Sequence, residues 1–259
     1  MTDVHTPPAS PLPEINKISM GALGAALWAG WRDFKTAPFY GVFFSAFYVL
    51  GGFFLVFLGA GTVTWTLAMS LGFPLVAPFA AVGLYEVSRR LEAGAPLKFG
   101  EIIGVVISEK DRQIPWMGAI IVIYFLFWTF LAHMIFALFL GPSALLQIGT
   151  SIADYTSGVA LIMIVTELIV GGVLAFVLFS LTVVSLPLLL EKEIDFVTAM
   201  LLSLRAVRQN VTVMMAWAAL IAAMTLVAMM PMFLGLMVVL PLLGHATWHL
   251  YRSVLAHNA

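Results

Sequence analysis

Long apolar runs separated by short polar segments dominate the chain. Six of these runs are long enough, at roughly 20 residues each, to cross the roughly 30 Å of hydrocarbon in a bilayer as helices. They lie near Pro38–Leu58, Thr62–Leu84, Pro115–Leu140, Gly158–Leu190, Val211–Met230 and Pro231–Leu250. The pattern predicts an all-α membrane protein whose six transmembrane helices form three consecutive hairpin units.

Two stretches do not have the length of a single span. The run Gly158–Leu190 is too long for a perpendicular helix, so we expect it to tilt, protrude or bend near Gly171-Gly172 or Pro187. The stretch Val211–Leu250 is about twice the length of a span. A tight turn at Pro231 is the economical way to divide it.

A short amphipathic segment with interspersed charge precedes each pair of spans, at Ile15–Thr36, Phe99–Gln113 and Phe196–Asn210. In the third, apolar residues recur at helical spacing, while Arg205 and Arg208 lie elsewhere around the helix. We expect short helices that lie in the cytoplasmic interface, with basic groups at anionic lipid head groups. A solvated connector is the alternative interpretation.

The basic residues define the orientation. If the first segment is cytoplasmic, all twelve Lys and Arg residues fall on the cytoplasmic face. They are Lys17, Arg32, Lys35, Arg89, Arg90, Lys98, Lys110, Arg112, Lys192, Arg205, Arg208 and Arg252. The opposite face has only the turn Gly59–Gly61, the loop Gly141–Ser157 with Asp154, and the turn at Pro231. By the positive-inside bias both termini are cytoplasmic, and a miscount by one span would place basic residues on both sides.

Composition agrees with membrane insertion. The chain is 62% hydrophobic and 10% charged, with a mean hydropathy of +1.07, whereas soluble domains are about 25% charged. We divide it into a disordered Pro-rich cytoplasmic tail (residues 1–14), one membrane domain (15–252) and a short cytoplasmic C-terminal tail (253–259). The N-terminal segment lacks the apolar core of a signal peptide.

Charge and cysteine content exclude several classes of function. A net charge of −1 argues against nucleic acid as a partner. Without cysteine there is no disulfide, thiolate nucleophile or cysteine-type metal centre. The partners we expect are the lipid bilayer and other membrane protein subunits, and we expect no cofactor.

Glu167 is the one acidic residue inside a predicted span, and a carboxylate in hydrocarbon needs protonation, a partner or a wet cavity. Counted from the outer helix ends, Glu167 lies roughly 13 Å deep and His133 of the third span roughly 12 Å deep. The two side chains can therefore meet. Such a pair serves either as a polar clasp between helices or as a proton or cation relay.

Two matching helix ends carry a second group of candidate residues. A proline, an aromatic, a polar residue and an arginine recur with identical spacing at Pro78, Tyr85, Glu86 and Arg89 and at Pro241, Trp248, His249 and Arg252. Arg90 extends the first set, and the middle unit keeps Pro187 and Glu191 without the spacing. An ancestral threefold repeat is one explanation. Anchoring of aromatic and arginine side chains at the head groups is the other.

No motif supports catalysis. His245 and His249 are four apart and share a helical face, as metal ligands would, but no third ligand is evident. Nucleotide-binding and hydrolytic signatures are absent. The mixed-sign clusters around Arg89-Arg90 and Glu109–Arg112 form either a docking surface or charges that fix helix position. We do not expect an enzyme.

Several stretches resemble an uncharacterised family of bacterial inner-membrane proteins, domain of unknown function 2189. They are Trp31–Asp33, Gly72–Pro78, Gly83–Arg90 and Pro241–Arg252, of which Gly83–Arg90 is the most specific. The resemblance extends over nearly the whole chain after the tail. It implies a six-span protein of the bacterial inner membrane and supplies no reaction.

Three functions remain open. The first is a non-catalytic accessory or organising component of a membrane assembly. The second is a small-ion or small-solute transporter or channel that uses Glu167 and His133. The third is a lipid-handling protein that uses its interfacial helices.

Overall fold

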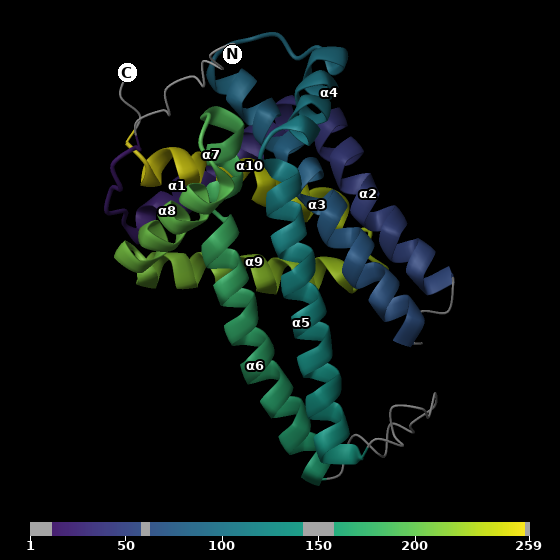
Figure 1. Cartoon of the computed structure of the whole chain (residues 1–259). Coiled ribbons are helices and arrows are strands. Elements are labelled where there is room, and N and C mark those ends of the chain that lie inside the picture. Colours follow the sequence, from purple (N-terminus) through teal and green to yellow (C-terminus); the bar gives the residue numbers. More distant parts are fainter. Residues whose placement is uncertain (1–11, 58–62, 142–157, 257–259) are drawn as a thin grey trace, which may run out of the picture.

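The computed structural model describes residues 12–57, 63–141 and 158–256, and the side chains of residues 52 and 55–77 are not included in the description. Within these ranges the chain is helical, and its one extended pairing is an isolated antiparallel bridge between Ile15 and Leu255. The all-α prediction is confirmed (Figure 1). The helices are α1 (Met20–Thr36), α2 (Pro38–Phe57), α3 (Val63–Glu92), α4 (Phe99–Ser108), η1 (Glu109–Asp111), α5 (Ile114–Leu140), α6 (Gly158–Thr182), α7 (Ser185–Glu191), α8 (Phe196–Gln209), α9 (Val211–Met229) and α10 (Leu236–Val254).

Three segments of the described chain are long and apolar enough to cross a membrane. They are Ile114–Leu140, Gly158–Glu191 and Val211–Met229, which correspond to α5, to α6 with α7, and to α9. Pro38–Gly51 in α2 is a shorter apolar helix. The count of six spans, the three hairpin units and the cytoplasmic termini stay predictions, and the loop Gly141–Ser157 and the turn Gly59–Gly61 lie almost entirely outside the described residues.

The long fourth apolar run is broken, and a proline explains where. α6 ends at Thr182 and α7 begins at Ser185. Pro187 has no N–H to donate to the carbonyl of Val183, four residues earlier, and its ring would clash with that carbonyl. The helix therefore stops at residues 183–184 and restarts. Gly171 and Gly172 lie inside an uninterrupted α6.

Each predicted amphipathic segment contains a helix: α1, α4 with η1, and α8. α8 begins at a capped end, because Asp195 Oδ1 accepts a hydrogen bond of 2.8 Å from the Thr198 amide. Its buried face includes Met200 and Val207, while Leu201 stays exposed. The position of these helices at a membrane surface remains a prediction.

α1 and α10 pack closely against each other. A Cβ added at Gly30 would lie 2.6 Å from the Ala246 amide nitrogen, so only glycine permits this approach. The two chain ends meet beside it, where Asn16 N donates to Val254 O and Ala256 N donates to Glu14 O, both at 2.8 Å. Residues just outside α1 and α10 are thus fastened together.

Figure 1 shows the arrangement of the helices. α5 and α6 run side by side and extend together away from the end of the molecule where α1, α4, α7 and α8 lie. The elements that carry most of the basic residues, α1, the end of α3, η1, α8 and the end of α10, gather at that end.

Candidate functional site

The C-terminal end of α3 is organised around Glu86, whose side chain is 0% exposed. Its carboxylate accepts hydrogen bonds of 2.7 Å from Arg89 Nε and from Arg90 Nε, one helical turn further along. Arg90 Nη1 also donates to Glu101 of α4 at 2.7 Å. This bond lowers the pKa of Glu101 and raises that of Arg90. The ion pairs fasten α4 to α3.

The end of α10 joins α3 to α7. Arg252 donates from Nε to Glu92 of α3 and from Nη1 to Glu191 of α7, both at 3.0 Å. Trp248 Nε1 donates to the other oxygen of Glu92 at 3.0 Å. Tyr251 donates its hydroxyl hydrogen to Glu191, and burial followed by this bond raises the pKa of Tyr251. The structure thereby brings together the ends of all three predicted units.

Two histidines of α10 face two different helices. His249 Nε2 lies 2.7 Å from Asp33 Oδ2 on α1, and Asp33 is buried. His245 Nδ1 lies 2.8 Å from Ser88 Oγ on α3, with both residues fully buried. His245 Nε2 has no hydrogen-bond partner among the described residues. The shared helical face inferred from the spacing is thus used for contacts with α1 and α3.

This arrangement lacks the geometry of a catalytic or metal site. Ser88 and His245 are spaced like a nucleophile and its base, but both are closed off from solvent and Asp33 is bonded to His249 instead. Across the described part of the chain no group of three or more His, Asp or Glu residues is placed to hold a metal ion. The contacts we observe serve helix packing.

The predicted signature residues at the two helix ends are placed in the same region. Tyr85, Glu86 and Trp248 are buried by protein, whereas Arg89 remains partly exposed. Their predicted role as anchors at the lipid head groups stays a prediction, because the covering groups seen here are other helices of the chain.

Glu167 and His133 lie on neighbouring helices, α6 and α5, which run side by side. Neither a hydrogen bond nor an ion pair joins them within the described chain. His133 Nδ1 instead lies 2.7 Å from the Thr129 carbonyl of its own helix. The predicted polar pair is brought near without a direct contact, and its role stays a prediction.

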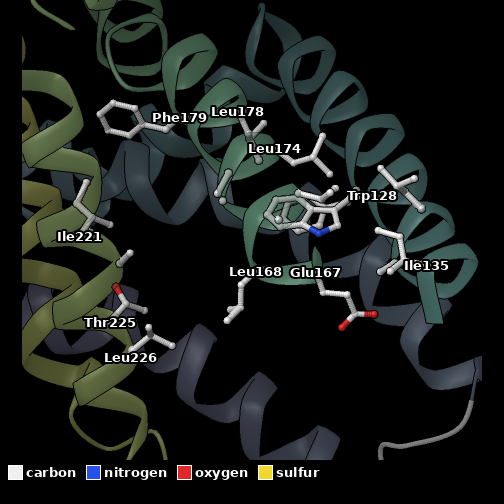
Figure 2. Close-up of a pocket in the computed structure, with 18 of the residues that line it drawn as sticks. Trp128, Ile135, Glu167, Leu168, Leu174, Leu178, Phe179, Ile221, Thr225 and Leu226 are labelled. Atoms are coloured by element: carbon white, nitrogen blue, oxygen red, sulfur yellow. The ribbon is translucent and has the colours of Figure 1, made fainter. Parts of the chain in front are cut away.

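Glu167 lies on the wall of an apolar groove of about 950 Å³ between the α5–α6 pair and α9. Figure 2 shows Glu167 and Leu168 side by side on α6, with Glu167 on the side of α5 and Leu168 toward α9. Small residues, Gly171, Gly172 and Ala175 of α6 and Ala222 of α9, form part of the lining. Thr182, Thr225 and the indole of Trp128 supply its other polar atoms.

Reasoning from sequence missed the partners more than the residues. Asp33 carries no signal as a site residue, because it lies 216 positions from the His249 that it contacts. In the sequence, Ser88 stands out only within the family-like stretch Gly83–Arg90, and Glu92 only within the mixed-sign cluster around Arg89-Arg90. The groove cannot be predicted from the sequence, because α5, α6 and α9 have the same uniformly apolar pattern.

A comparison with family models matches residues 66–191 to one described as "Predicted integral membrane protein (DUF2189)". The match covers α3 through α7 and is narrower than the resemblance drawn from the sequence, since the segments at Trp31–Asp33 and Pro241–Arg252 lie outside it. Neither the comparison with curated proteins nor that with solved structures found a match. Residues 66–191 of the chain thus match the DUF2189 family of predicted integral membrane proteins.

Proposed function

We propose that this chain is a non-catalytic component of the bacterial inner membrane that packs against other membrane proteins and organises them. The main support is the α5–α6 pair, which extends from the rest of the molecule and leaves most of its apolar surface uncovered. Lipid covers such a surface at no cost. Glu167 places a carboxylate on this surface, and lipid acyl chains have no hydrogen-bond donor for it.

At the other end of the molecule, side-chain hydrogen bonds between helices form a rigid base for this pair. Arg252, Glu92 and Glu191 tie three helices together, and Tyr124 of α5 donates to the Leu174 carbonyl of α6 at 2.7 Å. These bonds hold helices in place and engage the charged groups at the helix ends with one another. This favours a protein that presents surfaces over one that carries out a reaction.

The test is purification of the tagged protein from its own membrane in mild detergent, with identification of proteins that co-elute at near-equal amounts. We expect a reproducible stoichiometric membrane partner. An untagged membrane prepared in the same way controls for non-specific recovery. A homogeneous sample containing this chain alone would contradict the proposal.

A small-ion or small-solute transporter is the second candidate, favoured by the position of Glu167 on the groove wall and by a histidine, His133, on the neighbouring helix α5. Flux through the purified protein in liposomes tests it, with Glu167→Gln as the critical variant. Transport should be lost in Glu167→Gln and kept in Glu14→Gln, which changes an exposed acidic residue near the chain terminus. Absence of flux in the unaltered protein would exclude this candidate.

A further inference from the structure

We infer that the groove between the α5–α6 pair and α9 is a docking site for one transmembrane helix of a partner protein. This helix carries a hydrogen-bond donor or cationic side chain at the depth of Glu167. The inference rests on the proposed organising function and names the kind of partner. Three observations support it: the length of the groove, the small residues that line it, and a Glu167 carboxylate to which no described residue donates a hydrogen bond.

The groove has the length of a membrane span along α6. Its lining residues on that helix run from Ile164 to Thr182, which at 1.5 Å per residue is about 27 Å. A bilayer core is about 30 Å thick. An occupant that follows α6 therefore passes through most of the membrane, as a helix of a multi-pass or single-pass partner does.

The lining suits close approach of a helix backbone. A Cβ added at Gly172 would meet nothing within 4 Å, so the space above it is open. Gly171, Ala175 and Ala222 add further small surfaces around this opening. In membranes small residues mark the places where helices pack, because dispersion contacts between backbones replace the hydrophobic effect as the source of stability.

Glu167 selects the chemistry of the occupant. No described residue donates a hydrogen bond to its carboxylate, although the neighbouring α5–α6 contact is satisfied by Tyr124 and the Leu174 carbonyl. A bare carboxylate in hydrocarbon costs several kcal/mol. A Lys, Arg, His or amide side chain on a partner helix offsets this cost, whereas a lipid acyl chain brings no donor.

Site-specific photocrosslinking in intact native membranes tests the inference. A photoreactive phenylalanine derivative is placed at Leu168, which lines the groove and is 70% exposed, or at Ile169, which is 63% exposed and does not line it. We expect the Leu168 probe to capture a membrane protein through a peptide from an apolar span that carries a donor side chain. The Ile169 probe should capture that protein at less than a tenth of the yield.

Bulk added to the groove should release the partner. Gly172→Leu fills the floor from α6, and Ala222→Leu fills it from α9, so that a folding defect in one variant leaves the other informative. Each is expected to lower stoichiometric recovery tenfold or more. Val173→Leu, at an exposed position of α6 outside the groove lining, is the matched control and should leave recovery unchanged.

The donor is tested by paired changes. Glu167→Leu and replacement of the crosslinked partner's donor residue by Leu should each weaken recovery, and the double change should weaken it little further. Adducts of the Leu168 probe with lipid alone, or with a second copy of this chain, would overturn the inference. So would a partner that stays bound to both Gly172→Leu and Ala222→Leu, an outcome that leaves the organising function intact, whereas the absence of any stoichiometric partner contradicts that function itself.

Discussion

The start of α8 depends on one side chain, Asp195, which caps the helix through the Thr198 amide. Removing the cap in Asp195→Ala should lower stability by about 1 kcal/mol. Hydrogen bonds from Thr198 lower the pKa of Asp195 in the folded protein. Its contribution is therefore present above the unfolded pKa of about 4 and is lost as the pH falls through the lowered folded value.

Thermal unfolding in nanodiscs across this pH range measures the effect. Asp195→Asn is the matched control, since an asparagine oxygen keeps the cap but does not titrate. The difference between the unaltered protein and Asp195→Ala should shrink at low pH. A difference that stays constant from neutral to acidic pH would show that the carboxylate charge does not contribute.

Arg252 is a residue on which three helices converge. Arg252→Leu leaves Glu92 and Glu191 without their shared donor, and we expect a loss of about 1–3 kcal/mol. Arg252→Lys should be intermediate, because an ammonium group cannot reproduce the planar fork that reaches two carboxylates. Midpoints of denaturant unfolding measure both, with Arg208→Leu, at an exposed position of α8, as the control. Equal losses in Arg252→Leu and Arg208→Leu would argue against the bridge.

At the scale of the element, α1 offers two glycines with opposite roles. A Cβ at Gly30 would lie 2.6 Å from Ala246 N and 2.8 Å from Leu242 O, both backbone atoms of α10, while a Cβ at Gly24 would meet nothing within 4 Å. Gly30→Ala should therefore separate the two helices and destabilise the protein by about 1–3 kcal/mol. Gly24→Ala should stabilise it by up to about 1 kcal/mol through helix propensity.

Hydrogen exchange of the α1 amides distinguishes the two variants from a general loss of fold. Protection of the α1 amides from exchange should decrease in Gly30→Ala and stay unchanged in Gly24→Ala. If Gly30→Ala left the protection of α1 unchanged, the close α1–α10 contact would not be what holds α1 in place.

The elements also show what the sequence can predict. Apolar runs of span length predict helices because hydrocarbon leaves no other way to satisfy the backbone, and Pro187 was one of two positions predicted for the break in the fourth run. The spacing of His245 and His249 predicted a shared face. Nothing local predicted that Asp33 and Ser88 meet them, because periodicity identifies which face of a helix is buried and carries no information about the distant segment that covers it.

At the scale of the whole molecule, the contact between the chain ends limits the topology. Glu14 and Asn16 bond to Ala256 and Val254, so residues 14–16 and 254–256 lie on the same side of a membrane that the helices between them cross. The number of crossings between them is then even. The three candidate spans of the described residues are an odd number, so if all three cross, we expect a further segment, α2, α3 or α10, to cross as well.

The absence of cysteine makes this argument testable with single introduced thiols. Under the six-span prediction, Ser19→Cys and Ala93→Cys react with a membrane-impermeant thiol reagent from the cytoplasmic side, and Met232→Cys, in the exposed turn between α9 and α10, reacts only from the opposite side. The unaltered protein, which has no thiol, gives the background. Labelling of Met232→Cys from the same side as Ser19→Cys would mean that α10 does not cross. The additional crossing would then be made by α2 or α3. The apolar pattern of Pro231–Leu250 would in that case belong to a helix that is covered by α1, α2 and α3 and not by lipid.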